Sequence, residues 1–141
     1  MIRRPNEAGT RDDSGTAVLE VLVLGVGLLV PLLYGVLSVM AVQSASYAAT
    51  SAAREAARGY VTADSPLQGL ARARVATRLV LGDAGVSSAG PTVRCVGGCL
   101  VPGSRVDVTV RVVVPLPLLG GPGVTVTGQE SMPVDRYRSA P

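Results

Sequence analysis

The stretch GTAVLEVLVLGVGLLVPLLYGVLSVMAV, residues 15–42, decides the fold of this chain. From Val21 to Val42 it carries no charge, and at about 1.5 Å per helical residue it reaches roughly 33 Å, enough to cross the hydrocarbon core of a bilayer. The stretch therefore predicts a membrane-spanning helix. Glu20 departs from this pattern, because an unpaired carboxylate inside an apolar span costs on the order of a few kcal/mol.

A charge in this position needs a reason, and Gly15 offers one because Glu20 is the fifth residue after it. A cut between Gly15 and Thr16 would leave a new amino terminus near the carboxylate. A short polar leader, a glycine, a glutamate five residues later and an apolar helix together resemble the type IV prepilin processing signal. The resemblance implies that Gly15, Thr16 and Glu20 act in processing and assembly.

The order of the motifs that follow is similar to that of the TadE-like proteins, minor pseudopilins of tight-adherence (Flp) pilus systems. The apolar stretch contains Pro31 and Gly35, and a small-residue segment follows with the run Ala-Arg-Glu-Ala-Ala-Arg at residues 53–58. Beyond about residue 60 the resemblance rests on a β-rich tail, a cysteine pair and the terminal Pro-Val-Asp-Arg-Tyr-Arg.

This resemblance implies a membrane-anchored minor pseudopilin that takes part in assembling a tight-adherence pilus or a related secretion apparatus. The implied partners are a prepilin peptidase, other pilins and pseudopilins, and membrane proteins of the inner pilus platform. The alternative is an uncleaved, single-pass anchored module outside the cytoplasm that captures a partner or DNA. Cleavage after Gly15 separates the two hypotheses, because a plain anchor keeps its leader.

The composition bounds the rest of the chain. Of 141 residues, about ninety remain for a soluble part, which allows one small domain with a thin core. Phe and Trp are absent, so Val, Leu and Ala must form that core. The net charge of +3 comes from scattered arginines interleaved with acids, a poor footprint for nucleic acid, and no nucleic-acid partner is expected.

The first 42 residues set the expected topology. Residues 1–15 are polar and contain Pro5, Gly9 and Gly15, so we expect a cytoplasmic leader, followed by a transmembrane helix over 16–42. Arg3, Arg4 and Arg11 precede the span and two arginines follow it, which favours a cytoplasmic amino terminus. The expected location is the cell membrane, with a single pass and the carboxyl-terminal domain outside the cytoplasm.

The alanine-rich residues 43–62 predict that the helix continues outward, giving one rod from Thr16 to about Arg58 of roughly 65 Å. Within it, Pro31 should kink the helix. Tyr47 should anchor at the outer interface. Small side chains cover most of the outer part and suit packing against another helix, from the same domain or from a neighbour; they are Ser44, Ala45, Ala48, Ala49, Ala52, Ala53 and Ala56.

Residues 63–141 predict a small α+β domain. Asp64-Ser65-Pro66 is a helix start, and the helix over 67–81 should pack on the first through Leu70, Val75, Leu79 and neighbouring alanines. Residues 105–114 alternate between valine and polar side chains, which predicts a strand. Residues 92–96 and 99–101 should form a hairpin across Gly97-Gly98, and 124–127 with 130–134 should complete an antiparallel sheet of three or four strands. Gly120-Gly-Pro-Gly should be a loop.

The two cysteines, Cys95 and Cys99, are separated by Val-Gly-Gly, which would place them opposite each other at a hairpin end and within disulfide reach. A metal site would need further ligands and the chain has no His, while a redox pair would more usually be Cys-x-x-Cys. We therefore expect a structural disulfide and an oxidising compartment. No catalytic constellation is present, so neither an enzyme, a cofactor nor a small-molecule substrate is expected.

Overall fold

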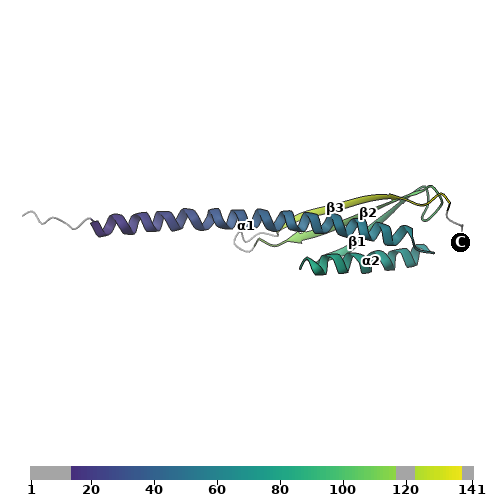
Figure 1. The fold of residues 1–141 in the computed structure, drawn as a ribbon, viewed down its shortest axis with the longest axis horizontal. Helices are drawn as coiled ribbons and strands as arrows, with labels where there is room; N and C mark the ends of the chain where they lie inside the picture. Colours follow the sequence, from purple (N-terminus) through teal and green to yellow (C-terminus); the bar gives the residue numbers. More distant parts are fainter. Residues whose placement is uncertain (1–13, 117–122, 138–141) are drawn as a thin grey trace, which may run out of the picture. The chain divides into compact units, whose positions relative to one another are not determined.

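The chain has an α+β fold with two helices and a three-stranded antiparallel sheet, seen in a computed structural model (Figure 1). The structure describes residues 14–116 and 123–137, with side chains from Ala17 onward. The elements follow in the order α1 (Ser14–Val61), α2 (Pro66–Asp83), β1 (Ser88–Val96), β2 (Arg105–Val114) and β3 (Val124–Pro133). The chain divides into two compact units, Met1–Leu37 and Ser38–Pro141, and α1 contributes to both.

The prediction of one long helix is confirmed, because α1 continues without a break from Ser14 to Val61. Helical structure passes through Pro31, and the kink expected there stays a prediction. From Ala17 to Val61, α1 is long and apolar enough to cross a membrane, and none of its most apolar part is buried inside the protein. The leader expected over 1–15 lies outside the described residues except for its last two.

The sheet is organised around β2, which is the central strand and pairs antiparallel with both neighbours. Its alternation is confirmed: Val106, Val108, Val110 and Val112 are all at most 1% exposed, while the side chains between them face the other way. β3 pairs with β2 over its full length, from Val124 opposite Val114 to Pro133 opposite Arg105. The two short segments expected at 124–127 and 130–134 are therefore one strand.

The hairpin predicted across Gly97-Gly98 is wrong. Residues 97–104 form a loop, and β1 pairs with β2 instead, with Cys95 opposite Val106. Leu100 departs from a strand, because its φ of 63° lies outside the β region, while its side chain is only 5% exposed and contributes to the core from the loop. The predicted loop at 120–123 lies outside the described residues apart from Gly123.

Within the second unit, the last turns of α1 pack on the valine face of the sheet. Ala49, Ala52, Ala53 and Ala56 are completely buried and belong to one core cluster with the valines of β2. Because alanine is short, the helix axis can lie close to the sheet. The expected packing of these small side chains is thus made within the chain's own domain, and none of these four offers a surface to a neighbouring helix.

α1 approaches the sheet very closely at Gly128 in the middle of β3. A Cβ atom at this position would overlap the backbone of Ala49 and would lie 2.5 Å from the backbone nitrogen of Thr50. A glycine inside a strand marks such a close approach. The absence of a side chain at 128 is therefore what allows α1 to pack this closely.

α2 begins as expected, with Ser65 as its N-cap and Pro66 in its first turn. The Ser65 hydroxyl accepts a hydrogen bond from the Gln68 backbone at 3.3 Å, and the Gln68 side chain accepts one from the backbone of Asp64 at 2.8 Å. The first bond satisfies a donor that the first turn of a helix leaves free, and the second ties the residue before the N-cap to that turn.

The packing face predicted for α2 is only partly right. Leu70 is half-buried, but Val75 and Leu79 are 53% and 63% exposed. The buried face consists of small side chains and ends in one leucine; its residues are Gly69, Ala73, Thr77 and Leu81. The reason is the close contact of the two helices, since the Tyr60 ring of α1 lies directly over Gly69, and a Cβ there would come within 3.0–3.2 Å of ring atoms. Larger side chains are therefore turned outward.

Candidate processing and assembly site, and the disulfide loop

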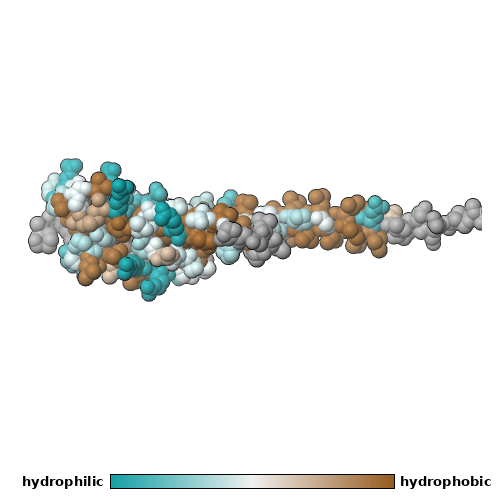
Figure 2. Space-filling view, turned by 180° about the vertical axis from the view of Figure 1, so that it is seen from behind, coloured by the Kyte–Doolittle hydropathy of each residue, from teal (hydrophilic) through white to brown (hydrophobic). Residues whose placement is uncertain are grey.

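Glu20 is the charged residue that the apolar part of α1 carries. Its side chain is exposed, and no ion-pair partner for it is present among the residues that the structure describes. Its neighbours Leu19 and Val21 are more than 60% exposed, and every Val, Leu and Met side chain from Val18 to Met40 is at least 50% exposed. Hydrophobic residues cover this part of α1, as the space-filling view shows (Figure 2). The carboxylate thus lies within a large exposed apolar surface, which is unfavourable in contact with water.

Gly15 and Thr16 belong to the first turn of α1, and their backbone is helical. In a helix, the backbone nitrogen of Thr16 and the residue four positions later lie on the same face, about 6 Å apart along the axis. Glu20 is that residue. Helix geometry alone therefore places Thr16 and Glu20 on one face, whereas Gly15, five residues before Glu20, lies about 140° around the helix from it.

The cysteine pair is joined. Cys95, near the end of β1, and Cys99, in the following loop, form a disulfide with their Cα atoms 5.1 Å apart. The loop needs backbone conformations with positive φ at Gly97, Gly98 and Leu100, and such a conformation is unfavourable for leucine by about 1 kcal/mol. The disulfide holds Cys99 against the strand end, and this places the Leu100 side chain in the core.

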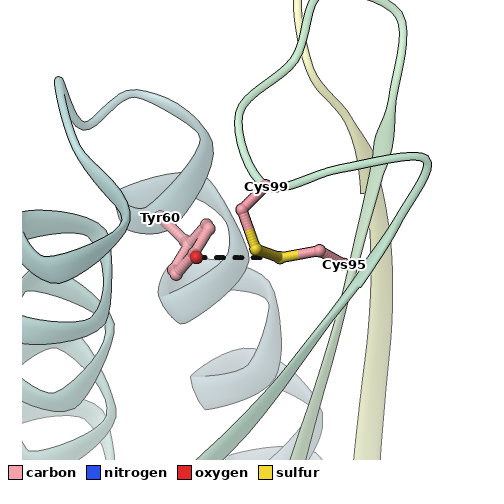
Figure 3. The surroundings of a disulfide bond; sticks show 3 residues. All are labelled: Tyr60, Cys95 and Cys99. Carbon is pink, nitrogen blue, oxygen red and sulfur yellow. Dashed lines mark hydrogen bonds between the residues drawn. A yellow bond between two sulfur atoms is a disulfide. The ribbon is translucent and has the colours of Figure 1, made fainter.

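Tyr60 connects this loop to the helices. Its hydroxyl lies 3.7 Å from the sulfur of Cys95 and donates to it, because a disulfide sulfur carries no proton (Figure 3). The tyrosine is 4% exposed, and burial raises the pKa of its hydroxyl above the usual value of 10. One aromatic side chain thus contacts α2 through Gly69 and the loop through the disulfide.

The structure also shows a feature that sequence reasoning missed, a cavity of about 340 Å³ between the second half of α2 and the start of β1. Arg74 and Arg78 line it, together with Thr77, whose hydroxyl is buried without a hydrogen-bond partner among the described residues. The arginine spacing of four was visible in the sequence, but the strand opposite was not. Within the described residues, no group of three or more His, Cys, Asp or Glu side chains could hold a metal ion.

Comparison of the chain with known proteins found no relative. No family model, no curated protein and no solved structure matches the chain.

Proposed function

We propose that this protein is a TadE-like minor pseudopilin, anchored in the cell membrane by α1, that takes part in assembling a tight-adherence pilus or a related secretion apparatus. A prepilin peptidase cuts between Gly15 and Thr16, and the amino terminus is cytoplasmic before the cut. Residues 43–141 lie outside the cytoplasm. The partners are other pilins and pseudopilins and the membrane proteins of the pilus platform.

The observation that carries the proposal is Glu20. From Ala17 to Ala53 it is the single charged residue of the sequence, and its side chain is exposed on an otherwise apolar helix surface. In an ordinary membrane anchor, a carboxylate at that depth would be unfavourable by a few kcal/mol without any compensating function. In a subunit that must recognise another helix inside the membrane, the carboxylate can serve as the recognised group.

The physical role of Glu20 follows from the new amino terminus. Cleavage leaves a free ammonium group on Thr16, and an ammonium and a carboxylate attract far more strongly in a low-dielectric setting than in water. The amine of an incoming subunit can therefore offset the cost of burying Glu20 of its neighbour. Pairing within one chain competes, because Thr16 lies one turn from its own Glu20. The pair between subunits fixes their axial register.

The first test is the mass of the mature protein. We expect the membrane-extracted protein to begin at Thr16 when the peptidase is present and at the original amino terminus when the peptidase gene is deleted. Intact-mass measurement distinguishes the two forms directly. Gly15→Leu should leave a full-length precursor in the membrane. A native protein that retains residues 1–15 in the presence of the peptidase would refute processing.

The second test separates the charge of Glu20 from membrane insertion. Glu20→Gln and Glu20→Leu should both be inserted and cut, but should no longer co-purify with the other subunits. Val21→Leu changes the adjacent apolar residue and serves as the matched control, which should assemble normally. Assembly of Glu20→Leu at the wild-type level would contradict the proposed pairing even if cleavage occurs.

A second candidate function is an uncleaved single-pass anchor whose outer domain captures a partner; the cavity between α2 and β1 supports partner capture and has no bearing on cleavage. Two arginines without ion-pair partners in the described parts of the chain line this cavity. The same mass measurement decides between the candidates, because the plain anchor keeps residues 1–15.

A further inference from the structure

The cavity between α2 and β1 has the chemical character of a binding site. Its volume of about 340 Å³ lies at the lower end of the range of ligand pockets. Its wall on the α2 side is made by Arg74, Thr77, Arg78 and Leu81. Its wall on the strand side is made by residues 86–91. The cavity therefore combines positive charge with apolar surface, and no acidic side chain lines it.

Arg74 and Arg78 are four residues apart, so their side chains leave the same face of α2 one turn apart. Both are exposed, and neither has an ion-pair or hydrogen-bond partner among the residues with described side chains. Arg72 of the same helix differs, because its guanidinium donates to the Thr62 carbonyl at 3.1 Å. Two neighbouring guanidinium groups that serve no internal contact can hold one carboxylate by charge-assisted hydrogen bonds.

Thr77 lies in the wall of the cavity on the α2 side. It is 2% exposed, and its hydroxyl has no hydrogen-bond partner among the described residues, although a buried polar group without a partner costs about 1–3 kcal/mol. A threonine inside a helix can bond the carbonyl four residues earlier, as Thr50 does to Ser46 at 2.9 Å, but Thr77 makes no such bond. Because the oxygen itself is shielded from a molecule the size of water, the exposed arginines, and not this hydroxyl, are the groups that a ligand in the cavity meets.

The strand side of the cavity suits an extended peptide. β1 is an edge strand, and its register against β2 shifts by one residue between Ser88 and Pro91, which leaves Ala89 and Gly90 without partners in β2. An edge strand presents backbone groups that an added extended segment can bond. The Gly90 N–H already donates to the Ser88 hydroxyl at 3.1 Å and Pro91 has no N–H, so such a segment would donate its own N–H groups to carbonyls of β1. Val86 and Pro91 line the same cavity and offer apolar contact to the neighbouring side chains of such a segment.

We propose that this cavity binds an acidic, extended peptide segment of a partner protein, with a carboxylate between Arg74 and Arg78 and adjacent apolar side chains on Leu81, Val86 and Pro91. The inference goes beyond the proposed role in assembly and does not depend on whether residues 1–15 are removed. Failure of peptide binding would therefore leave the processing hypothesis intact, and failure of processing would leave the cavity site intact.

The test uses the full-length protein in lipid nanodiscs and follows the methyl resonances of Thr77, Leu81 and Val86. The probe is the capped peptide acetyl-Val-Glu-Val-Glu-Val-amide, and its counterpart with glutamine in place of glutamate is the neutral control. We expect saturable shifts of these methyl groups with the glutamate peptide. The glutamine peptide should bind about tenfold more weakly, because charge-assisted hydrogen bonds are roughly twice as strong as neutral ones.

Three variants sharpen the test. The double variant Arg74→Gln/Arg78→Gln should weaken binding at least about tenfold, whereas Arg105→Gln, which removes one exposed charge at the end of β2 opposite Val96, should leave it within about twofold. Thr77→Val should leave peptide binding within about twofold and, without peptide, unfold at a higher temperature, because it removes an unpaired buried hydroxyl. The methyl resonance of Leu100, far along the chain, reports that each variant is folded.

Four outcomes would overturn the proposal. They are equal affinity for the glutamate and glutamine peptides, unchanged affinity of the folded double arginine variant, no shift at millimolar peptide, and equal affinity for sodium phosphate at the same residues. The last outcome would mean that the cavity recognises a simple anion, from a lipid headgroup or from solution, and not a peptide.

Discussion

Substituting Gly128 by alanine tests whether the close approach of α1 to the sheet holds the outer domain together. Gly128 lies opposite Val110 on the face of β3 that the helix covers. The atoms that an added Cβ would meet are the backbone carbonyl of Ala49 and the backbone nitrogen of Thr50, the latter at 2.5 Å. Real Cβ atoms essentially never approach other heavy atoms within 3.0 Å, so the helix or the strand must move.

The magnitude follows from what would have to move. Inserting a methyl group into a packed core costs about 1–3 kcal/mol. The cost should lie at the upper end, about 3 kcal/mol, because backbone atoms cannot rotate away and Ala49, Ala52 and Ala53 are all completely buried. For a unit of roughly 100 residues, 1 kcal/mol corresponds to about 4–8 °C, so Tm should fall by roughly 12–24 °C.

The assay is thermal and urea unfolding of the full-length protein in detergent micelles, followed by far-ultraviolet circular dichroism, to which α2, the sheet and the outer turns of α1 contribute the change on unfolding. Gly82→Ala is the matched control, since a Cβ there meets nothing within 4 Å, and it should be neutral or stabilising by at most about 1 kcal/mol. Ala49→Gly added to Gly128→Ala should not restore stability, because the clash is with the backbone of residue 49 and not with its methyl group. A Gly128→Ala protein with a Tm within about 4 °C of wild type would refute the reasoning.

Two further perturbations test the region around Tyr60. Replacing Cys95 and Cys99 together by serine should lower the free energy of unfolding of the domain by about 2 kcal/mol, which is the loop-closure entropy expected for so short a loop. Urea unfolding with and without reductant measures this loss. An unchanged urea midpoint in the variant would show that the disulfide is dispensable. Stability should also fall at alkaline pH, because burial raises the pKa of Tyr60 in the folded protein. The folded state keeps its full stability below the pKa of an unfolded tyrosine, about 10, and loses stability as the pH rises from there through the raised pKa of the folded state. Tyr60→Phe should make the free energy of unfolding fall less steeply with pH above about 10. An equally steep fall in this variant would mean that other groups cause it.

The sequence by itself predicted the elements whose pattern is local. The uncharged run after Glu20 and the alanine-rich residues beyond it predicted α1, the Ser65-Pro66 start predicted α2, and the alternation of valines predicted β2 with its buried face. Each of these depends on residues within a few positions of one another, so propensity and periodicity suffice. The disulfide was predicted from a hairpin that would place the two cysteines opposite each other; the bond is present, but the loop over 97–104, and not a hairpin, brings the sulfurs together.

The tertiary structure decided what depends on residues distant in the chain. Gly128 looked like a break in a strand, and only the position of Ala49 on the other side of the core shows why glycine stands within it. Val75 and Leu79 looked like core residues by their spacing, but the Tyr60 ring over Gly69 selects the face with the small side chains. The cavity requires β1 beside Arg74 and Arg78, which periodicity cannot place. Local pattern determines which segments become helix or strand, whereas the free energy of packing, summed over contacts between segments, determines which faces meet.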